Sequence, residues 1–571
     1  MSDEVEMKDN FCDSQPVIQS SVIQDFGLLF VLDLKFKILQ VSVNAESSLG
    51  IPCAEILGRK MTDFLDPEIS HVLDNGLKSG DMRCLNGMGL KLKTHSGPKA
   101  FSASFSFYEK YLVLELEFFD DKIQTASELI ARNGIFRLSL ELKQSATLQE
   151  MCAKTASELK AILGMDKVMI YSFDESWHGT VLAEAKESGM DSYIGLKFPA
   201  TDIPEPARRL YHLNPVRMIP GVGNPAIRVE PALNPLTGTP SDFKKCILRG
   251  VNPVHLEYLQ NMSVISSISV AIIHKGALWG LIAFHHRSYR TLSIIVRNAL
   301  EMLSECFSSQ LFLLEAAESN LEMAEIENYR KLTAEAVILQ ETPSSVLSLE
   351  IEKISGLMNA QGAAFYLDGQ WFEWGTVPVR AELELLVKWL QSKSAGSVYT
   401  THSLARDYAG GEKIKDTASG LLAVSISGTF EELVLWFRPE EAQIVKWGGD
   451  PNQTIHFSLD KKFYHPRQSF QIWKETVKLQ SSVWKTSEKI AADQMRMILT
   501  NALLGFRSAR LKTISGLLPI CAYCKKIRDD QNSWRVIEEY VQKRSTASFS
   551  HGICPDCYKR VMKESGLNGG S

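Results

Sequence analysis

The sequence lacks any apolar run long enough to cross a membrane, since no stretch reaches the roughly 18–20 apolar residues of a spanning helix. Its first ten residues, MSDEVEMKDN, are acidic and contain no apolar core, which excludes a secretory signal. A strong charge of one sign is absent too, because 62 Lys and Arg stand against 67 Asp and Glu, a net charge of −5. Such a balance offers no broad basic surface for nucleic acid. A soluble cytoplasmic protein is expected.

Cysteine is also sparse, with 10 in 571 residues, too few for a disulfide scaffold. One group of cysteines stands among apolar neighbours and is interpreted as small buried side chains: Cys53, Cys84, Cys152, Cys246 and Cys306. Cys12 stands alone near the N-terminus. The other four crowd together near the C-terminal end: Cys521, Cys524, Cys554 and Cys557. Cysteine chemistry is therefore expected at these last two places.

The composition is that of an ordinary globular protein, with 45% hydrophobic and 23% charged residues, and the length favours about three to five domains. Short β-rich runs alternate with helical spacing in three regions, with a helical stretch expected around residues 45–57 in the first, which predicts an α+β fold with three globules joined by long helices. The predicted parts are an N-terminal segment (1–25), a first globule (26–121), a second (122–312), a third (313–480), a helical linker (481–515) and a small Cys-rich module (516–571).

Two segments have the spacing of long helices. Residues 291–340 contain no Pro and carry large apolar residues at three- and four-residue steps, typical of a connector or a dimer seam. In the linker an apolar stripe recurs every seven residues: Val483, Ile490, Met497, Leu504 and Leu511. The second heptad position is polar, so the pattern supports a coiled coil only in part.

Motifs in the second globule are too specific for packing alone. Residues 198–211 read FPATDIPEPARRLY, with an acidic residue between two stiffening prolines and then a helix with two arginines. NPVRMIP (214–220), LRGVNPVHLEYLQNM (248–262) and LWGLIAFHH (278–286) follow. This combination closely resembles the GAF domain of phytochromes, the bacterial ones in particular. The first globule resembles their PAS domain and the third their PHY domain, in which WGGDP (447–451) and PRQSF (466–470) are similar to the two halves of a hairpin called the tongue, about 440–472. The resemblance covers roughly residues 10–480.

This resemblance implies a bound linear tetrapyrrole, and the residue types agree with one. Such a ligand needs cations and hydroxyls for two propionates, acceptors for pyrrole N–H groups, and aromatic walls. By motif position the propionates are expected at Arg217 and Arg249, with Ser267 and Ser269 as further donors. Asp202, through its carbonyl, and His255 are expected to bind the pyrrole nitrogens, and His285 the terminal ring carbonyl. The remaining expected pocket residues are Tyr171, Tyr211, Tyr258, Phe198 and Ile203, and Arg467 of the tongue is expected to pair with Asp202.

The location of the attachment cysteine decides the type of chromophore. Relatives that use reduced bilins carry a cysteine immediately before the His of the GAF motif, where this chain has Val254. Relatives that use biliverdin attach it to a cysteine ahead of the PAS domain, a placement that Cys12 matches. Thr201 stands where Ser is usual, and residues 18–27 depart from the family's lead-in. In the family that lead-in threads through a loop of the GAF domain, which residues 221–246 would supply here.

The C-terminal region predicts a metal site rather than a kinase. The residues after Phe470 contain neither a glycine-rich ATP lid nor a Gly-Gly-Asp-Glu-Phe signature, so a histidine kinase is not expected in this chain. Two Cys-x-x-Cys pairs supply four thiolates, the set that structural Zn²⁺ prefers, and predict a zinc-ribbon-like module with ligands Cys521, Cys524, Cys554 and Cys557. A redox dithiol pair is the alternative. Adjacent Lys525, Lys526 and Arg528 are interpreted as a solvated face, although they could bind nucleic acid.

The function expected from all this is a red/far-red photoreceptor that binds biliverdin covalently, is not an enzyme and relays isomerisation to a non-kinase output. A homodimer is expected, together with a protein partner such as a response regulator or a separate kinase. The alternative is a signalling regulator with a non-covalent tetrapyrrole, or a redox- or ligand-sensing pocket, whose output is the zinc module.

Overall fold

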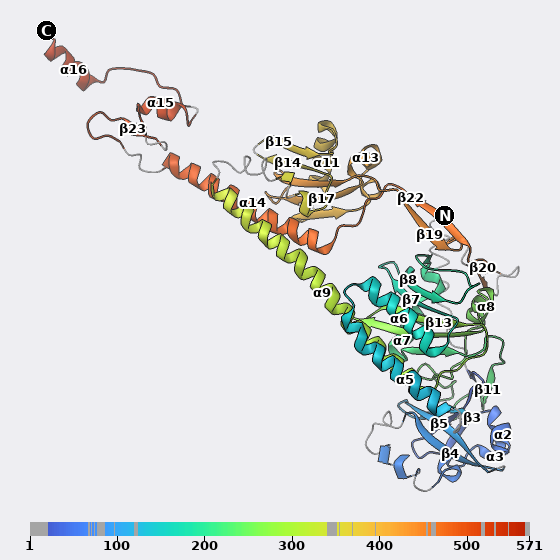
Figure 1. The fold of residues 1–571 in the computed structure, drawn as a ribbon. Helices are drawn as coiled ribbons and strands as arrows, with labels where there is room; N and C mark the ends of the chain where they lie inside the picture. The colour runs from blue at the N-terminus through green and yellow to red at the C-terminus, as the bar shows by residue number, and fades with distance from the viewer. Residues whose placement is uncertain are drawn as a thin grey trace. The chain divides into compact units, whose positions relative to one another are not determined.

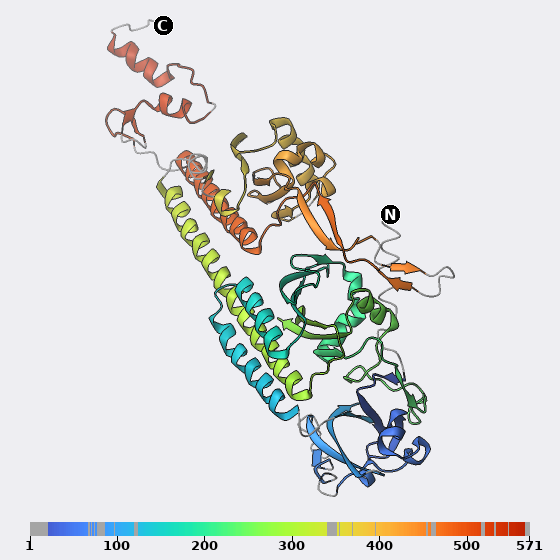
Figure 2. The ribbon, with the colours of Figure 1, turned by 45° about the vertical axis from the view of Figure 1, so that its right-hand side comes forward.

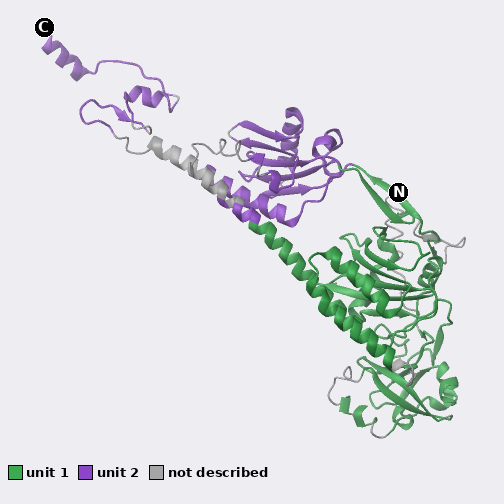
Figure 3. Ribbon diagram, viewed as in Figure 1, with its two compact units in different colours: residues 1–324, 441–478 green, residues 325–440, 479–571 purple. Residues whose placement is uncertain are grey.

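The computed structural model describes residues 21–66, 69, 71–73, 75–76, 86–95, 97–118, 124–339, 351–352, 355–367, 369–393, 396–452, 455–457, 464–515, 520–529, 533–545 and 547–565. The chain divides into two compact units (Figure 3). Unit 1 comprises residues 1–324 and 441–478, and unit 2 comprises residues 325–440 and 479–571. Residues 441–478 therefore belong to the N-terminal unit although the chain reaches them late.

The first globule of unit 1 is built on a seven-stranded sheet whose buried residues form their own apolar core. Its strand order is β1 (Val22–Ile23), β11 (Ile227–Glu230), β3 (Ile38–Ser42), β2 (Gly27–Leu32), β6 (Leu112–Phe118), β5 (Gly97–Phe107) and β4 (Met88–Thr94). The helical stretch expected over 45–57 is two short helices, α2 (Asn44–Leu49) and α3 (Cys53–Ile56). The break occurs because Gly50 adopts a left-handed φ of 70° and Pro52 follows.

Residues 21–25 lie between two parts of the second globule. On one side Val22 pairs with Arg228 of β11. On the other the backbone N–H of Gln24 donates to Leu248 O at 2.8 Å, and its side-chain amide donates to Met218, Ile247 and Arg249 carbonyls at 3.1–3.3 Å. Residues 221–246, expected from the resemblance to supply a loop here, contain Arg228 and end just before Ile247 and Leu248. Residues 21–25, which lead into the first globule, are therefore hydrogen-bonded to the second.

The second globule centres on an eight-stranded sheet to which the tongue contributes two strands. The order is β10 (Val216–Ile219), β12 (Ser266–His274), β13 (Ala277–His286), β7 (Lys167–Phe173), β8 (Gly179–Lys186), β9 (Lys197–Phe198), β19 (Gln443–Gly448) and β22 (Ile472–Val477). β19 and β22 form an antiparallel hairpin, and Trp447 of β19 pairs parallel with Lys197 of β9. Between β19 and β22 in the sequence, β20 (Ile455–Phe457) and β21 (Tyr464–Pro466) form a second, shorter hairpin.

Side chains alternate along a strand, so one face of this sheet packs into the main core and the other lines a cavity. Val168, Ile170 and Phe284 point to one face and join the main core. That face is covered by α5 (Gln124–Glu141), α6 (Leu148–Leu163) and the first part of α9 (Ile294–Leu339), which lie side by side in Figures 1 and 2. The opposite face carries α7 (Glu205–Leu213), α8 (Pro253–Asn261) and the short helix η4 (Ala200–Asp202). The cavity described below lies on this second face.

Unit 2 contains a five-stranded antiparallel sheet in the order β15 (Gln370–Gly375), β14 (Gly362–Leu367), β18 (Leu433–Arg438), β17 (Gly420–Ser425) and β16 (Val398–Thr401). Between these strands in the sequence lie the helices α11 (Arg380–Ser392), α12 (Leu404–Asp407), η5 (Gly411–Ile414) and α13 (Lys415–Ala418). The helix α14 (Thr486–Ser515) packs on this sheet with Ala492 and Leu499 buried, and the Arg438 guanidinium pairs with Glu488 at 2.6 Å. Ile490, Met497 and Leu504 of the predicted stripe are 40–59% exposed.

The C-terminal part of unit 2 contains small elements only: β23 (Ile527–Arg528), β24 (Trp534–Arg535), α15 (Ile537–Gln542) and α16 (Pro555–Glu564). The apolar side chains buried there, within the described part of residues 520–565, are Ile527 and Tyr540. Tyr523, Ile553 and Tyr558 are more than half exposed. Across the described residues of the whole chain, no helix combines the length and the apolar character needed to cross a membrane.

Candidate functional site: a cavity under the second sheet

The cavity lies between the sheet of the second globule and the helices η4, α7 and α8, and Pro466 of the tongue reaches its wall. The space between its lining side chains, open mouth included, measures about 1490 Å³. The sequence-predicted residues that line it are Tyr171, Phe198, Asp202, Ile203, Tyr211, Arg217, His255, Tyr258, Ser267, Ser269 and His285. Arg249 and Arg467 do not line it. The structure therefore gathers most of the predicted set, from four separate motifs and from the strands β7 and β12.

Several lining residues were missed from the sequence. Met169, Leu281 and Ala283 line the cavity because side chains alternate along a strand. Met169 lies two residues before Tyr171, and Ala283 and Leu281 lie two and four residues before His285. Strand alternation from Tyr171 and His285 would have found them. Tyr193 also lines the cavity, but it comes from the irregular segment between β8 and β9, where no periodic pattern marks it.

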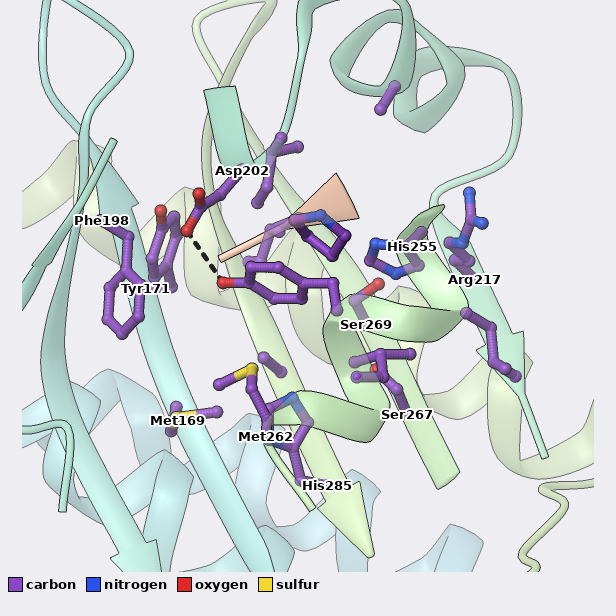
Figure 4. Close-up of a pocket in the computed structure, with 18 of the residues that line it drawn as sticks. Met169, Tyr171, Phe198, Asp202, Arg217, His255, Met262, Ser267, Ser269 and His285 are labelled. Carbon is purple, nitrogen blue, oxygen red and sulfur yellow. Dashed lines mark hydrogen bonds between the residues drawn. The ribbon is translucent and has the colours of Figure 1, made fainter. Parts of the chain in front are cut away.

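Aromatic side chains enclose one side of the cavity, where Tyr171 and Phe198 lie in Figure 4. The ring of Phe198 is 6.1 Å from that of Tyr171 and meets the ring of Tyr193 edge-on at 5.8 Å, measured between centroids. Phe470 of the tongue meets Tyr258 edge-on at 5.1 Å. A flat apolar ligand would find rigid walls here, and the tongue supports one of them through the contact of Phe470 with Tyr258.

Two histidines line the cavity, the buried His285 on β13 and the half-buried His255 on α8. Burial lowers the pKa of His285 to about 3, helped by the charge of Lys167. Burial also lowers the pKa of His255 to about 3, and the charges of Arg217 and His285 add to this. Both imidazoles are therefore neutral at pH 7 and each offers one N–H donor and one acceptor. Among the described residues, Nδ1 of His285 has no hydrogen-bond partner.

The side of the cavity opposite Phe198 carries a cation, Arg217 of β10 (Figure 4). Its Nε is buried without a hydrogen-bond partner among the described residues, and burial lowers the pKa of its guanidinium. Arg249 is 3% exposed and donates through Nη1 to Cys246 O at 2.7 Å, away from the cavity lining. Burial, reinforced by Arg217, lowers the pKa of Arg249 to about 10. An acidic group of a ligand would relieve this crowding of buried positive charge.

Asp202 connects the cavity to the tongue. Its carboxylate accepts a hydrogen bond from the hydroxyl of Tyr258 at 2.8 Å, drawn in Figure 4, and forms an ion pair with Nη2 of Arg467. The side chains of Asp202 and Arg467 are 7% and 3% exposed, so water screens the pair little. Arg467 also donates through Nη1 to Gly448 O at 2.6 Å. The structure thus contains the pairing of Arg467 with Asp202 that the sequence predicted, and the same guanidinium reaches the other half of the tongue.

The predicted attachment cysteine and the predicted metal ligands are not part of this cavity. Cys12 lies outside the described residues, while Val254 lines the cavity beside His255. The backbone N–H of Cys524 donates to Cys521 Sγ at 3.5 Å and lowers the pKa of that thiol, and the N–H of Cys557 lowers the pKa of Cys554. Among the described residues, however, no three or more potential ligands lie close enough to hold a metal ion. The structure shows two separate thiol pairs, and the predicted zinc site stays a prediction.

Comparison with known proteins accounts for this architecture. Sequence-family models match in the order PAS fold (residues 12–119), GAF domain (147–311) and phytochrome region (326–508). The crystal structure of a bacteriophytochrome from R. palustris is 32% identical with a TM-score of 0.79, covering 87% of this chain and 99% of that one. The chain belongs to the phytochrome family. The photosensory core module of the Stigmatella aurantiaca phytochrome is similar too, at 33% identity and a TM-score of 0.76, with 86% and 98% covered.

Among curated phytochromes, cyanobacterial phytochrome B of Nostoc sp. is 34% identical over 496 residues, 86% of this chain. The chain spans 66% of the length of that relative and 64% of cyanobacterial phytochrome A of the same organism. The match to the phytochrome region ends at residue 508, ahead of the four clustered cysteines. The PAS, GAF and PHY parts and the mixed α and β architecture expected from the sequence are thereby confirmed.

Proposed function

We propose that the chain is a red/far-red light sensor whose cavity binds a linear tetrapyrrole. The observation that carries this proposal is the combination, in one cavity, of aromatic walls, two neutral imidazoles and the guanidinium of Arg217, whose buried Nε has no hydrogen-bond partner in the described part of the chain. A long conjugated body matches the apolar walls, pyrrole nitrogens match the imidazoles, and a propionate matches Arg217. When bound, the tetrapyrrole supplies visible-light absorption and the isomerisation of one double bond.

The residues of this chain fit such a group through their unused hydrogen-bonding capacity. Arg217 would hold one propionate, with Ser267 and Ser269 on the adjoining strand as further donors. Ser269 Oγ already shares a hydrogen bond of 2.8 Å with the hydroxyl of Tyr211. Arg249 would have to turn from Cys246 O to reach the second propionate. His285 would bind the terminal ring carbonyl through its buried, unpartnered edge.

Biliverdin, attached covalently at Cys12, is the tetrapyrrole we propose. A thioether needs a thiol, and Val254 stands at the position that serves the other class of relatives. The lining places Val254 in the cavity wall, so no thiol is available there. The segment that leads from Cys12 enters the described structure at residue 21, bonded to the second globule.

Signal transfer would begin at Asp202. Arg467 binds its carboxylate and the carbonyl of Gly448, so a change in the partners of Asp202 alters the attachment of both halves of the tongue. A tongue released from the cavity is free to change its secondary structure, which biases a two-state equilibrium of the whole chain. We propose that the output is a protein contact rather than catalysis, made by a cytoplasmic homodimer with a response regulator or a separate kinase.

For the C-terminal segment we propose that zinc binds to Cys521, Cys524, Cys554 and Cys557. Two observations support this: the N–H···S contact within the first pair, and the small number of buried apolar side chains around it. A segment with so small a core generally needs a staple to fold, and four thiolates supply one. The two pairs would have to approach each other, which metal binding itself would drive.

The deciding experiment is an absorption spectrum of the chain produced with biliverdin, recorded before and after red and far-red light. The proposal expects a red-absorbing pigment whose spectrum changes reversibly. The competing hypothesis, a regulator with a non-covalent tetrapyrrole or a redox- or ligand-sensing pocket, expects colour that is lost on denaturation, or none. A colourless protein in the presence of excess biliverdin would refute the light-sensing function.

A further inference from the structure

Lys167, the first residue of β7, is a buried cation that no motif accounts for. Its side chain is 2% exposed, and its ion-pair partner Glu184 of β8, at 3.6 Å, is 3% exposed. Burying two charges is unfavourable unless both are well bonded, and an apolar pair of similar size often serves stability as well. The presence of charge at this position therefore calls for a reason other than stability.

The polar contacts of this pair go to one short segment between β8 and β9. Lys167 Nζ donates to Asp191 O at 2.6 Å. Glu184 accepts hydrogen bonds from the hydroxyl of Ser192 at 2.6 Å and from the backbone N–H of Tyr193 at 3.0 Å. Three successive residues of an otherwise irregular segment are thus held by the two charges.

The segment matters because Tyr193 lines the cavity. Its ring is 5% exposed, packs edge-on against Phe198, and has Lys167 Nζ 3.7 Å from its centroid. A cation at this distance from an aromatic face is attractive and fixes the tilt of the ring. Lys167 thereby acts on the aromatic wall from behind, without entering the cavity lining.

Lys167 also faces His285. The two residues are opposite each other in the antiparallel pairing of β7 with β13, which puts their side chains on the same face of the sheet with Cβ atoms about 4.5–5.5 Å apart. The charge of His285 in turn lowers the pKa of His255 of α8. The charged groups that act on Lys167 are Glu184 of β8, Asp191 of the segment, and Lys186, which is paired with Lys167 on the neighbouring strand β8.

We infer that Lys167 is a positioning residue of the cavity, which with Glu184 holds Tyr193 in the aromatic wall and places a fixed positive charge beside His285. The consequence for a bound chromophore rests on the proposed function: the charge would bias how His285 meets the terminal ring and hence the stability of the light-induced state. The positioning of Tyr193 does not depend on the chromophore.

The first test uses the full-length apoprotein. Lys167→Met alone leaves Glu184 as an unpaired buried charge, so the decisive variant is the charge-free pair Lys167→Met with Glu184→Gln, compared with Lys167→Arg and with Lys160→Met. Lys160 pairs with Glu187 nearer the surface. We expect the amide of Tyr193 to exchange hydrogen about tenfold faster in the charge-free variant. We also expect the pKa of His285, followed by imidazole NMR, to rise by about one unit. Lys167→Arg should restore both.

The second test uses chain loaded with biliverdin, with rates normalised to the loaded fraction. The charge-free variant should change the dark-reversion rate of the light-induced state about threefold or more, and Lys167→Arg should return it towards wild type. Wild-type exchange at Tyr193 together with wild-type titration of His285 in the charge-free variant would overturn the inference. If wild-type chain takes up no biliverdin, the proposed function fails, while the apoprotein measurements still decide the role of Lys167.

Discussion

The side-chain amide of Asn261, at the end of α8, donates a hydrogen bond to the backbone carbonyl of Arg467 at 3.0 Å. The helix that carries His255 is therefore tied to the tongue residue whose guanidinium binds Asp202. The backbone and the side chain of Arg467 are thus held by different elements of the second globule. Two contacts of different chemistry converge on one tongue residue, which allows the contribution of each to be separated by mutation.

Removal of the guanidinium should weaken the tongue more than removal of the amide. Arg467→Ala leaves the buried Asp202 carboxylate without its cation, whereas Asn261→Ala removes one neutral hydrogen bond. We expect Arg467→Ala to change the rate of dark reversion of the light-induced state by more than tenfold and Asn261→Ala to change it by a few-fold, about 1 kcal/mol. Time-resolved absorption after a light pulse measures both rates. Unchanged photoconversion and reversion in Arg467→Ala and in Asp202→Ala would show that the tongue is not coupled to the cavity.

Covalent attachment should depend on Cys12. Cys12→Ser is expected to abolish the zinc-fluorescent band on a denaturing gel, because no thiol stands at the Val254 position. Colour in the native protein is expected to persist, since the cavity walls are intact. Cys53→Ser, which alters a buried thiol of the first globule, is the matched control. A covalent band that survives in Cys12→Ser would place the attachment elsewhere.

The apoprotein should lose stability in mild acid. The folded pKa of His255 and of His285 is about 3, whereas an unfolded histidine titrates near 6.5, so the unfolded chain binds more protons between these values. The free energy of unfolding is thus fully present above pH 6.5 and falls with decreasing pH, by about 1.4 kcal/mol per pH unit for each histidine.

Urea unfolding of the apoprotein between pH 4.5 and 7.5 measures this dependence. His285→Gln should reduce the slope, while His212→Gln, at an exposed position on α7, should not. Equal slopes in His285→Gln and wild type would mean that His285 is protonated in the folded chain.

Gly179 should be indispensable for the aromatic wall. A Cβ at this position would lie 1.7 Å from the ring of Tyr171, so the ring must leave its place in Gly179→Ala. We expect a loss of stability of about 1–3 kcal/mol and a reduced yield of biliverdin-loaded protein. Gly223→Ala serves as the control, because a Cβ there meets no atom within 4 Å. Denaturant midpoints and the visible-to-ultraviolet absorbance ratio compare the two variants. Wild-type values of both in Gly179→Ala would contradict the packing described here.

Metal should fold the C-terminal segment. Elemental analysis of purified full-length chain is expected to give about one zinc per chain, lost in Cys521→Ser and in Cys554→Ser. Circular dichroism and protease sensitivity of residues after 515 should change when zinc is chelated, while the visible spectrum of the pigment stays as it was. One zinc per two chains would indicate a site shared between copies, and a metal-free segment resistant to protease would refute the site.

Much of the cavity was predictable because its residues lie in long, specific motifs and in strands with a period of two. Tyr171, His285 and Ser269, expected in the pocket from the resemblance, line the cavity, and their strand neighbours Met169 and Ala283 follow from the alternation of side chains along a strand. The long helix expected over 291–340 is α9, since an uninterrupted apolar spacing without Pro specifies a helix locally. The helical stretch over 45–57 was wrong as a single element because a left-handed glycine interrupts it.

What the sequence determined by itself is the order of the domains and the residue types of the cavity. These depend on motifs and on periodicity, which are local properties of the chain. The tertiary structure alone decided that β11 completes the first sheet, that Tyr193 closes the aromatic wall, and that Arg249 turns to Cys246. It also brought Lys167 and Glu184 together behind that wall. Such arrangements depend on how segments pack and which side chains become buried, which no local pattern of residues encodes.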